Sequence, residues 1–308
     1  MTQAFHRRTF LAAGLSAGLA AGLPAALALT APRTFAQGPG RGQEKGENIA
    51  FGMVTYQWGR DWDLDTLLAN CAALKYTGVE LRTTHKHGVE PSLTAAQREE
   101  VRRKFADSGV TCVGIGSDER FDNPDPAVLK KAIEKAKEFI RLSHDIGGSG
   151  VKVKPDRFHE EVPREKTIEQ IGATLNELGE YAEGFGQQVR LEVHGQCAEL
   201  STIKAIMEIA KHSAAAVCWN CNDADLKPPG LAANFKMVCD RFGQTCHVRE
   251  LDGKGYPFSE LFQLLVGIDY SGWVLLEAHS NPPGDLAKYA EQRGLFDELL
   301  AAAKKAVG

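Results

Sequence analysis

The chain has 308 residues, enough for two average domains or for one α/β barrel of about 250 residues behind a leader. Hydrophobic residues make up 43% of it and charged residues 25%, values near the globular norm that exclude general disorder and a wholly membrane-embedded chain. A net charge of −4 gives little attraction for a phosphate backbone, so we expect no nucleic acid partner.

The N-terminus predicts an export signal. The segment HRRTFL at residues 6–11 precedes a weakly apolar run of alanine, glycine and leucine to about Thr30, and no acidic residue occurs before Glu44. Paired arginines followed by a mild, glycine-rich apolar run are typical of twin-arginine signals. Residues 34–36 offer small side chains at a plausible cleavage point.

The predicted organisation is therefore a signal peptide over 1–36, a linker over 37–47 and one barrel domain over 48–308. Such a protein is exported to the periplasm or the exterior and has no membrane contact once the signal is cleaved. A retained membrane anchor is the alternative, although glycines and Pro24 interrupt the apolar run.

The seven cysteines are an odd number scattered along the chain, unlike the dense even set of a disulfide scaffold. Cys218 and Cys221 form one CxxC, but a second pair that would complete a structural zinc site is missing from the sequence. We expect most of the cysteines to be ordinary core thiols.

From Asn48 onward, short β-branched runs alternate with amphipathic stretches, the pattern of repeated βαβ units. The expected strands are Ile49 to Thr55, Gly78 to Arg82, Val110 to Ile115, Gly150 to Lys154, Val189 to His194, Ala215 to Cys221, Thr245 to Glu250, and Gly272 to Ala278. Eight strands, each followed by a helix, predict a single (β/α)8 TIM barrel. A doubly wound sheet would show a glycine-rich phosphate turn after its first strand, where this chain has TYQWGRDWD.

Several residues mark the expected helix ends. Thr94 with Gln97 predicts a capping box, and Ser201 is a candidate N-cap. Glycines that follow helical runs serve as stop signals, and they are Gly78, Gly109, Gly147 and Gly186.

Polar residues occupy the lumen-facing positions of several strands. Side chains alternate along a strand, so one parity packs on the helices and the other faces the barrel interior. This rule sends the following side chains inward: Glu80, Arg82, Lys152, Lys154, Arg190, Glu192, His194, Asn220, His247 and Glu277. A salt bridge that plugs the lumen would explain one such charge, but so many charges favour a functional site at the C-terminal mouth.

Four of these residues have the spacing of consecutive strands. Glu192, Asn220, His247 and Glu277 are separated by 28, 27 and 30 residues, about one strand-helix unit each. Two carboxylates, an imidazole and an amide oxygen suit one divalent metal ion, either manganese, magnesium, cobalt or zinc. The sequence therefore predicts a metal site at the mouth.

The motifs GVELR, RLEVHG, VCWNCND, HVRELDG and WVLLEAH, spread over nearly the whole mature chain, resemble the sugar phosphate isomerase/epimerase group of xylose isomerase-like TIM barrels. The resemblance implies that Glu192, Asn220, His247 and Glu277 hold one divalent cation, with Asn220 in place of the family's aspartate. Because asparagine lacks the charge, we expect weaker metal binding or help from Asp223 or His194.

The resemblance also implies a reaction. Family members move a proton next to a carbonyl, and a metal stabilises the enediolate. Glu192 and Glu277 would remove and return the proton from opposite faces, or else serve as structural ligands only. An exported enzyme meets unphosphorylated sugars or keto-sugars, so a small carbohydrate is the expected partner.

Further polar residues are candidate substrate contacts. The expected substrate-binding residues are Glu80, Arg82, His87, Lys152, Lys154, His194, Arg249 and His279. Arg190 is a further candidate, and His194 and His279 are alternatively expected to orient the two glutamates. The loop TTHKHGVEP is expected to place His85 and Glu90 over the mouth, either as a substrate lid or as a solvated loop. Trp58 and Trp62 are expected either to stack on a sugar face or to serve packing within the protein.

Other functions stay open at this point. A keto-sugar or inosose dehydratase or hydratase begins with the same proton abstraction, and an exported sugar-binding barrel with a degenerate metal site is the non-enzymatic alternative. An endonuclease IV-type phosphodiesterase needs a richer metal cluster and a basic surface. Xylose isomerase itself would need a second set of acidic ligands. The sequence is compatible with a homo-oligomer and does not decide it.

Overall fold

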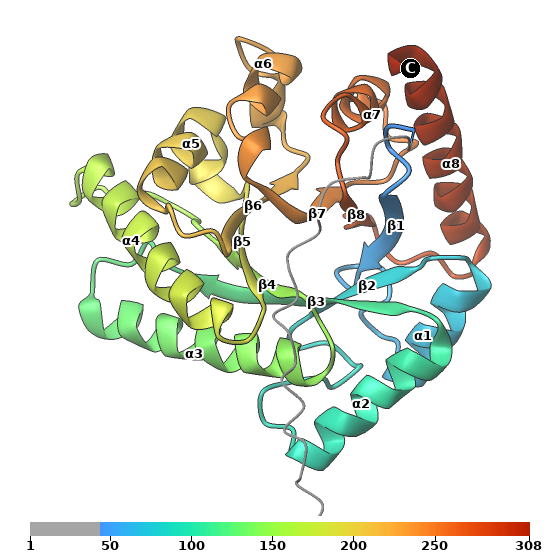
Figure 1. Ribbon diagram of the computed structural model, residues 1–308, viewed down its shortest axis with the longest axis horizontal. Coiled ribbons are helices and arrows are strands. Elements are labelled where there is room, and N and C mark those ends of the chain that lie inside the picture. Colours follow the sequence, from blue (N-terminus) through green and yellow to red (C-terminus); the bar gives the residue numbers. More distant parts are fainter. Residues whose placement is uncertain (1–43) are drawn as a thin grey trace, which may run out of the picture. The chain divides into compact units, whose positions relative to one another are not determined.

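All eight predicted strands form, and they pair in parallel in the order in which they occur along the chain. The computed structural model describes residues 44–308, and within these β8 pairs with β1 to close the barrel (Figure 1). The strands are β1 (Ile49–Val54), β2 (Gly78–Arg82), β3 (Thr111–Arg120), β4 (Gly150–Lys154), β5 (Gln188–Glu192), β6 (Ala215–Asn220), β7 (Phe242–Val248) and β8 (Gly272–Leu276). The predicted (β/α)8 TIM barrel is confirmed.

An α-helix follows each strand, and Figure 1 shows these helices around the outside of the barrel. They are α1 (Leu64–Ala73), α2 (Ala95–Ser108), α3 (Pro126–Asp145), α4 (Arg164–Glu183), α5 (Leu200–Ile209), α6 (Leu231–Lys236), α7 (Phe258–Gly267) and α8 (Ala287–Val307). Short 3-10 turns occur at η1 (Gly195–Ala198), η2 (Asp223–Leu226) and η3 (Cys239–Arg241). Over residues 44–308, each helix is too short or too polar to cross a bilayer. The predicted signal peptide and the first part of the linker lie outside the described residues.

The capping predictions are confirmed at three helices and wrong at two positions. Thr94 and Gln97 form the capping box of α2, and Gly109 ends that helix with φ 71°. Gly147 and Gly186 take positive φ after α3 and α4. The predicted N-cap Ser201 is wrong, because α5 already begins at Leu200 and its N-cap is Glu199.

Gly78 is also wrong as a stop signal, because it is the first residue of β2. The left-handed residue after α1 is Lys75, with φ 59°. A side chain at Gly78 would place its Cβ 2.5 Å from the Trp273 ring, so the glycine serves close packing between β2 and β8. A glycine after a helical run is typical both of a helix end and of close packing between strands, so the two uses look alike in the sequence.

The largest error in strand length concerns β3. The sequence predicts that it ends at Ile115, but it continues to Arg120 through the polar segment GSDER. Gly116 pairs with Arg82 of β2 and Arg120 pairs with Lys154 of β4, so the extension is held on both sides. These side chains line the mouth of the barrel, where a strand has no need of apolar residues.

Aromatic packing covers the seam between the first and last strands. Phe51 of β1 is 1% exposed, and its ring stacks on Phe296 of α8 with centroids 4.6 Å apart. The Tyr76 ring is 4.9 Å from that of Phe51. Because α8 follows β8, the Phe51–Phe296 contact joins the first strand to the last helix of the barrel.

We therefore expect Phe51→Ala to lower the free energy of unfolding by about 3–5 kcal/mol, since it leaves a cavity at the seam. Chemical denaturation of both proteins measures this difference. Val128→Ala on α3 is the control, because Val128 is 46% exposed and should change stability by no more than about 0.5 kcal/mol. Equal losses in the two variants would contradict a special role of the seam.

Candidate metal and active site

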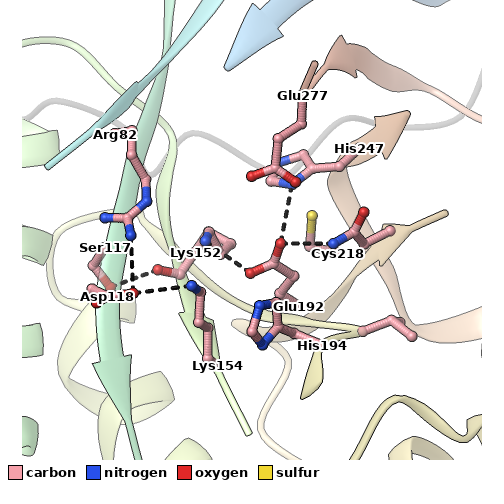
Figure 2. Close-up of polar contacts among 12 residues, drawn as sticks. Arg82, Ser117, Asp118, Lys152, Lys154, Glu192, His194, Cys218, His247 and Glu277 are labelled. Carbon is pink, nitrogen blue, oxygen red and sulfur yellow. Dashed lines mark hydrogen bonds and ion pairs between the residues drawn. The ribbon is translucent and has the colours of Figure 1, made fainter. Parts of the chain in front are cut away.

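Three of the predicted metal ligands meet inside the barrel. Glu192 is the last residue of β5, His247 lies near the end of β7, and Glu277 directly follows β8. Each offers one ligand atom, and these atoms all lie within 4.8 Å of one another. All three side chains are buried, and Figure 2 shows them pointing toward one another. These three residues, which the strand spacing predicted to meet, therefore lie together in the structure.

His247 lies between three carboxylates. Its Nδ1 atom is 3.5 Å from Glu192 Oε1 and 3.5 Å from Glu277 Oε2, while Nε2 is 3.2 Å from Glu80 Oε1. Neither ring nitrogen makes a well-aligned hydrogen bond to another residue in 44–308. An Nε2–H directed at Glu80 leaves the lone pair of Nδ1 facing the two ligand carboxylates, as a metal-binding imidazole requires.

Glu80, which the sequence suggested as a substrate contact, faces His247. Its side chain is fully buried on the far side of the His247 ring from Glu192 and Glu277. Gly116 of β3 makes room for it, because a Cβ at that position would lie 2.9 Å from Glu80 Oε1. The geometry gives Glu80 the role of orienting His247.

Glu192 accepts a hydrogen bond at each oxygen. Lys152 Nζ donates to Oε2 at 2.8 Å, and Asn220 Nδ2 donates to Oε1 at 2.9 Å. From the sequence, Asn220 was expected to offer its carbonyl oxygen to a metal. In the structure its amide nitrogen faces the cluster instead, because the nearest group is an anionic carboxylate that needs a donor.

The charges of the cluster support one another. Burial works against the charge of Glu192, but the Lys152 ammonium and the His247 ring outweigh it and hold the pKa of this carboxyl well below its usual range. Burial also disfavours a charged imidazole, yet Cys218, Glu80 and Glu277 around the ring raise the pKa of His247 well above its usual value. Without a metal, the proton on His247 balances part of the carboxylate charge.

A network of ion pairs, which we call the rim network, lies beside the cluster (Figure 2). Asp118 of β3 is its centre, and its Oδ1 atom is 3.0 Å from Arg82 Nη2 and 3.0 Å from Lys154 Nζ. Burial favours the neutral acid, but hydrogen bonding and charge from Lys154, with Arg82, lower the pKa of Asp118 to about 2. The predicted contacts Arg82 and Lys154 therefore lie together, held by a carboxylate.

The rim network continues to His194. Arg120 bridges Asp118 and Asp156 at 3.1 and 2.9 Å, and His194 Nδ1 is 3.2 Å from Asp156 Oδ1. A cavity of about 450 Å³ opens beside this network, lined by the ends of β3 and β4 and by α3. The metal-ligand cluster does not line the cavity, but His194 and Lys154 lie between the two. Asp118 and Asp156 were not predicted as site residues because both lie beyond the predicted strand ends.

Other predicted substrate contacts have protein partners. His87 is buried, its Nε2 lies 2.9 Å from Arg82 O, and its Nδ1 accepts from Val89 N, so it organises its own loop. Arg249 donates to Cys221 O and pairs with Asp223 at 3.2 Å. The His279 ring is exposed and packs edge-on against Tyr56.

The remaining candidates serve packing or local structure. Trp58 is 2% exposed, and its indole packs on Tyr289, as Trp62 does. Glu90 binds Thr83 and Thr84 within its loop. Arg190 pairs with Lys152 in register and bonds to Ser149 and Gln244, which places it below the cluster toward the N-terminal end of the barrel. These contacts favour the packing reading of the aromatic residues.

The comparison with known families identifies the fold family. The model of the xylose isomerase-like TIM barrels matches residues 68–299. The chain belongs to this family. The resemblance inferred from the strand motifs is thereby confirmed. No curated protein matches the sequence.

Solved structures with the same fold include several sugar epimerases. An L-ribulose 3-epimerase superimposes with a TM-score of 0.72 at 18% identity, over 84% of this chain and 96% of that one. A 3-keto-D-glucoside 4-epimerase from E. coli gives 0.68 at 14% identity, over 82% and 99%. A D-psicose 3-epimerase from Clostridium cellulolyticum H10, solved with D-tagatose, gives 0.65 at 16%, over 84% and 98%. At these identities the likeness concerns the fold.

The raised pKa of His247 predicts how the metal-free protein responds to pH. Protonation of a group whose pKa rises on folding stabilises the fold below its unfolded value of about 6.5, and this contribution is lost as pH rises through the higher folded value. We expect the melting temperature of chelator-treated protein to fall with pH above about 6.5, and to fall less steeply in His247→Gln.

Thermal unfolding of the two proteins across the same pH series measures the effect. Asp225, whose pKa burial raises to about 7, titrates in the same range but is present in both proteins, so its contribution cancels in the comparison. Parallel pH profiles would show that the His247 proton does not stabilise the cluster.

Proposed function

We propose that this protein is a divalent-metal-dependent sugar isomerase or epimerase that moves a proton on the carbon next to a carbonyl of an unphosphorylated sugar or keto-sugar. The observation that carries the proposal is the buried group of Glu192, His247 and Glu277, whose ligand atoms lie within 4.8 Å of one another. Family membership and the epimerases among the solved structures of this fold support it.

The residues present fit a metal ion. Two carboxylates and one imidazole, the latter with a buried Nδ1 that lacks a hydrogen-bond partner among residues 44–308, form a three-ligand set with positions left for substrate oxygens. Mixed oxygen and nitrogen ligands suit manganese, cobalt, magnesium or zinc. Such an ion, when bound, polarises the substrate carbonyl and stabilises the enediolate.

The two glutamates differ in their freedom to exchange protons. Glu277 contacts His247 at 3.5 Å, and its carboxylate has no hydrogen-bonding side chain on it within residues 44–308. Glu192 instead has a donor on each oxygen. Glu277 is therefore the group that removes the substrate proton most readily, and Glu192 acts from the other side of the cluster once a donor is released.

The rim network supplies donors for the sugar. Arg82, Lys154 and His194 converge beside the cluster and carry N–H groups that suit hydroxyl and carbonyl oxygens. Asp118 fixes the positions of Arg82 and Lys154, so little side-chain entropy of these two residues is lost on binding. The N-terminal sequence supports export, and an exported enzyme meets sugars without phosphate.

Metal content tests the site directly. Protein purified without chelators is expected to hold about one equivalent of divalent metal, and His247→Ala is expected to lose most of it because the only nitrogen ligand is removed. Elemental analysis gives the measurement, with His279→Ala as control because that ring is exposed and lies outside the cluster. Absence of metal in both proteins, even after incubation with these ions, would favour the sugar-binding alternative.

Solvent exchange tests the reaction. Incubation of candidate ketosugars with the metal-loaded enzyme in deuterium oxide is expected to exchange one carbon-bound proton, which NMR detects. Glu277→Gln is expected to slow epimer formation by at least about 100-fold, since it removes a general base. Loss of a hydroxyl from the product would instead identify a dehydratase. Full turnover in Glu277→Gln would exclude this glutamate as the base.

A further inference from the structure

Lys152 is a buried cation in the middle of the site. It lies on β4, and its Nζ atom is 2.8 Å from Glu192 Oε2, with both side chains 1% exposed. Ser117 Oγ donates to the backbone oxygen of Lys152 at 2.6 Å, which fixes the strand at this point. Figure 2 shows Lys152 between the rim network and the metal-ligand cluster. An ammonium this deeply buried requires anionic partners.

The cluster contains more negative charge than one lysine neutralises. Glu80, Glu192 and Glu277 are all buried around His247. Among residues 44–308, Lys152 is the one permanent cation that makes an ion pair with any of these three carboxylates. The Lys152 ammonium is 2.8 Å from Glu192 Oε2 and shielded from solvent, so its charge acts directly on the cluster.

Lys152 and Asn220 both reduce the attraction for a metal ion. Asn220 contributes no negative charge and donates to Oε1 of Glu192, one of the proposed ligands. Lys152 places a positive charge at Oε2 of the same carboxylate. Each buried carboxylate strengthens the attraction for a divalent cation and the ammonium weakens it, so a site with aspartate at 220 and no lysine would attract the metal more strongly.

We propose that Lys152 is an internal cation that shares Glu192 with the metal, so that the site is assembled before the metal arrives and binds the metal less tightly than it would without this charge. This inference rests on the proposed metal site and concerns its regulation. The lysine is a positioning residue for Glu192, and its charge sets the metal affinity through repulsion at short range.

Metal titration of the full, chelator-treated protein tests the inference, with manganese as the probe. Lys152→Gln keeps a hydrogen-bond donor for Glu192 but removes the charge, so calorimetry is expected to show manganese binding at least about tenfold tighter than in the wild type. Asn220→Asp, which adds a negative charge, is expected to tighten binding as well. Lys154→Gln is the matched control, because Lys154 pairs with Asp118 in the rim network, and its effect should stay below about threefold.

Thermal unfolding gives a second measurement that does not depend on activity. Without metal, Lys152→Gln is expected to melt at a lower temperature than the wild type, because Glu192 loses its counter-charge. With saturating manganese, the melting temperature of Lys152→Gln should rise by a larger increment than that of the wild type. Circular dichroism confirms that the variant is folded before either comparison.

The outcomes separate this inference from the proposed function. If the wild type binds manganese and folded Lys152→Gln binds it equally or more weakly, the inference on Lys152 is wrong and the metal site stands. If neither protein binds any of the four metals, both proposals fail. Binding by Lys152→Gln alone would contradict the metal-dependent function of the wild type and the sharing of Glu192, and would show that Lys152 excludes the metal.

Discussion

The burial of carboxylates at the C-terminal ends of the strands is the constraint on which the site depends. Glu80, Glu192 and Glu277 are at most 6% exposed, and each carboxylate costs several kcal/mol to desolvate unless a cation or a donor meets it. His247 and Lys152 meet that demand from β7 and β4. The need to neutralise these buried carboxylates explains which charged side chains occupy the barrel interior, and the strands determine where those side chains lie.

Much of this arrangement could be predicted from the sequence, because strand alternation and unit spacing are local signals. They identified Glu192, His247 and Glu277 as members of one cluster, and the structure brings them together. Alternation gives the face on which a side chain lies but not its height along the barrel axis. For that reason Arg190, which lies two residues below Glu192, was grouped with the mouth although it bonds to Ser149 near the other end.

The other differences have a similar cause. The extension of β3 is polar and lies beyond the predicted strand end at Ile115, so Asp118 was missed although it pairs with Arg82 and Lys154. The role of Glu80 depends on which side of the His247 ring it approaches, and that depends on the register of β2 against β3 and on the space beside Gly116. The direction of the Asn220 amide depends on the charge of its neighbour. Such properties arise only when non-adjacent segments meet.

The closure of the barrel between β1 and β8 links the site to the folding of the whole domain. The proposed ligands come from β5, from β7 and from the residue after β8, and the orienting carboxylate comes from β2. Glu80 of β2 comes next to His247 of β7 only when the sheet closes, because β1 connects β2 to β8. A ligand bound here therefore stabilises the complete barrel over every partly folded form, and occupancy of the site would report that folding is finished.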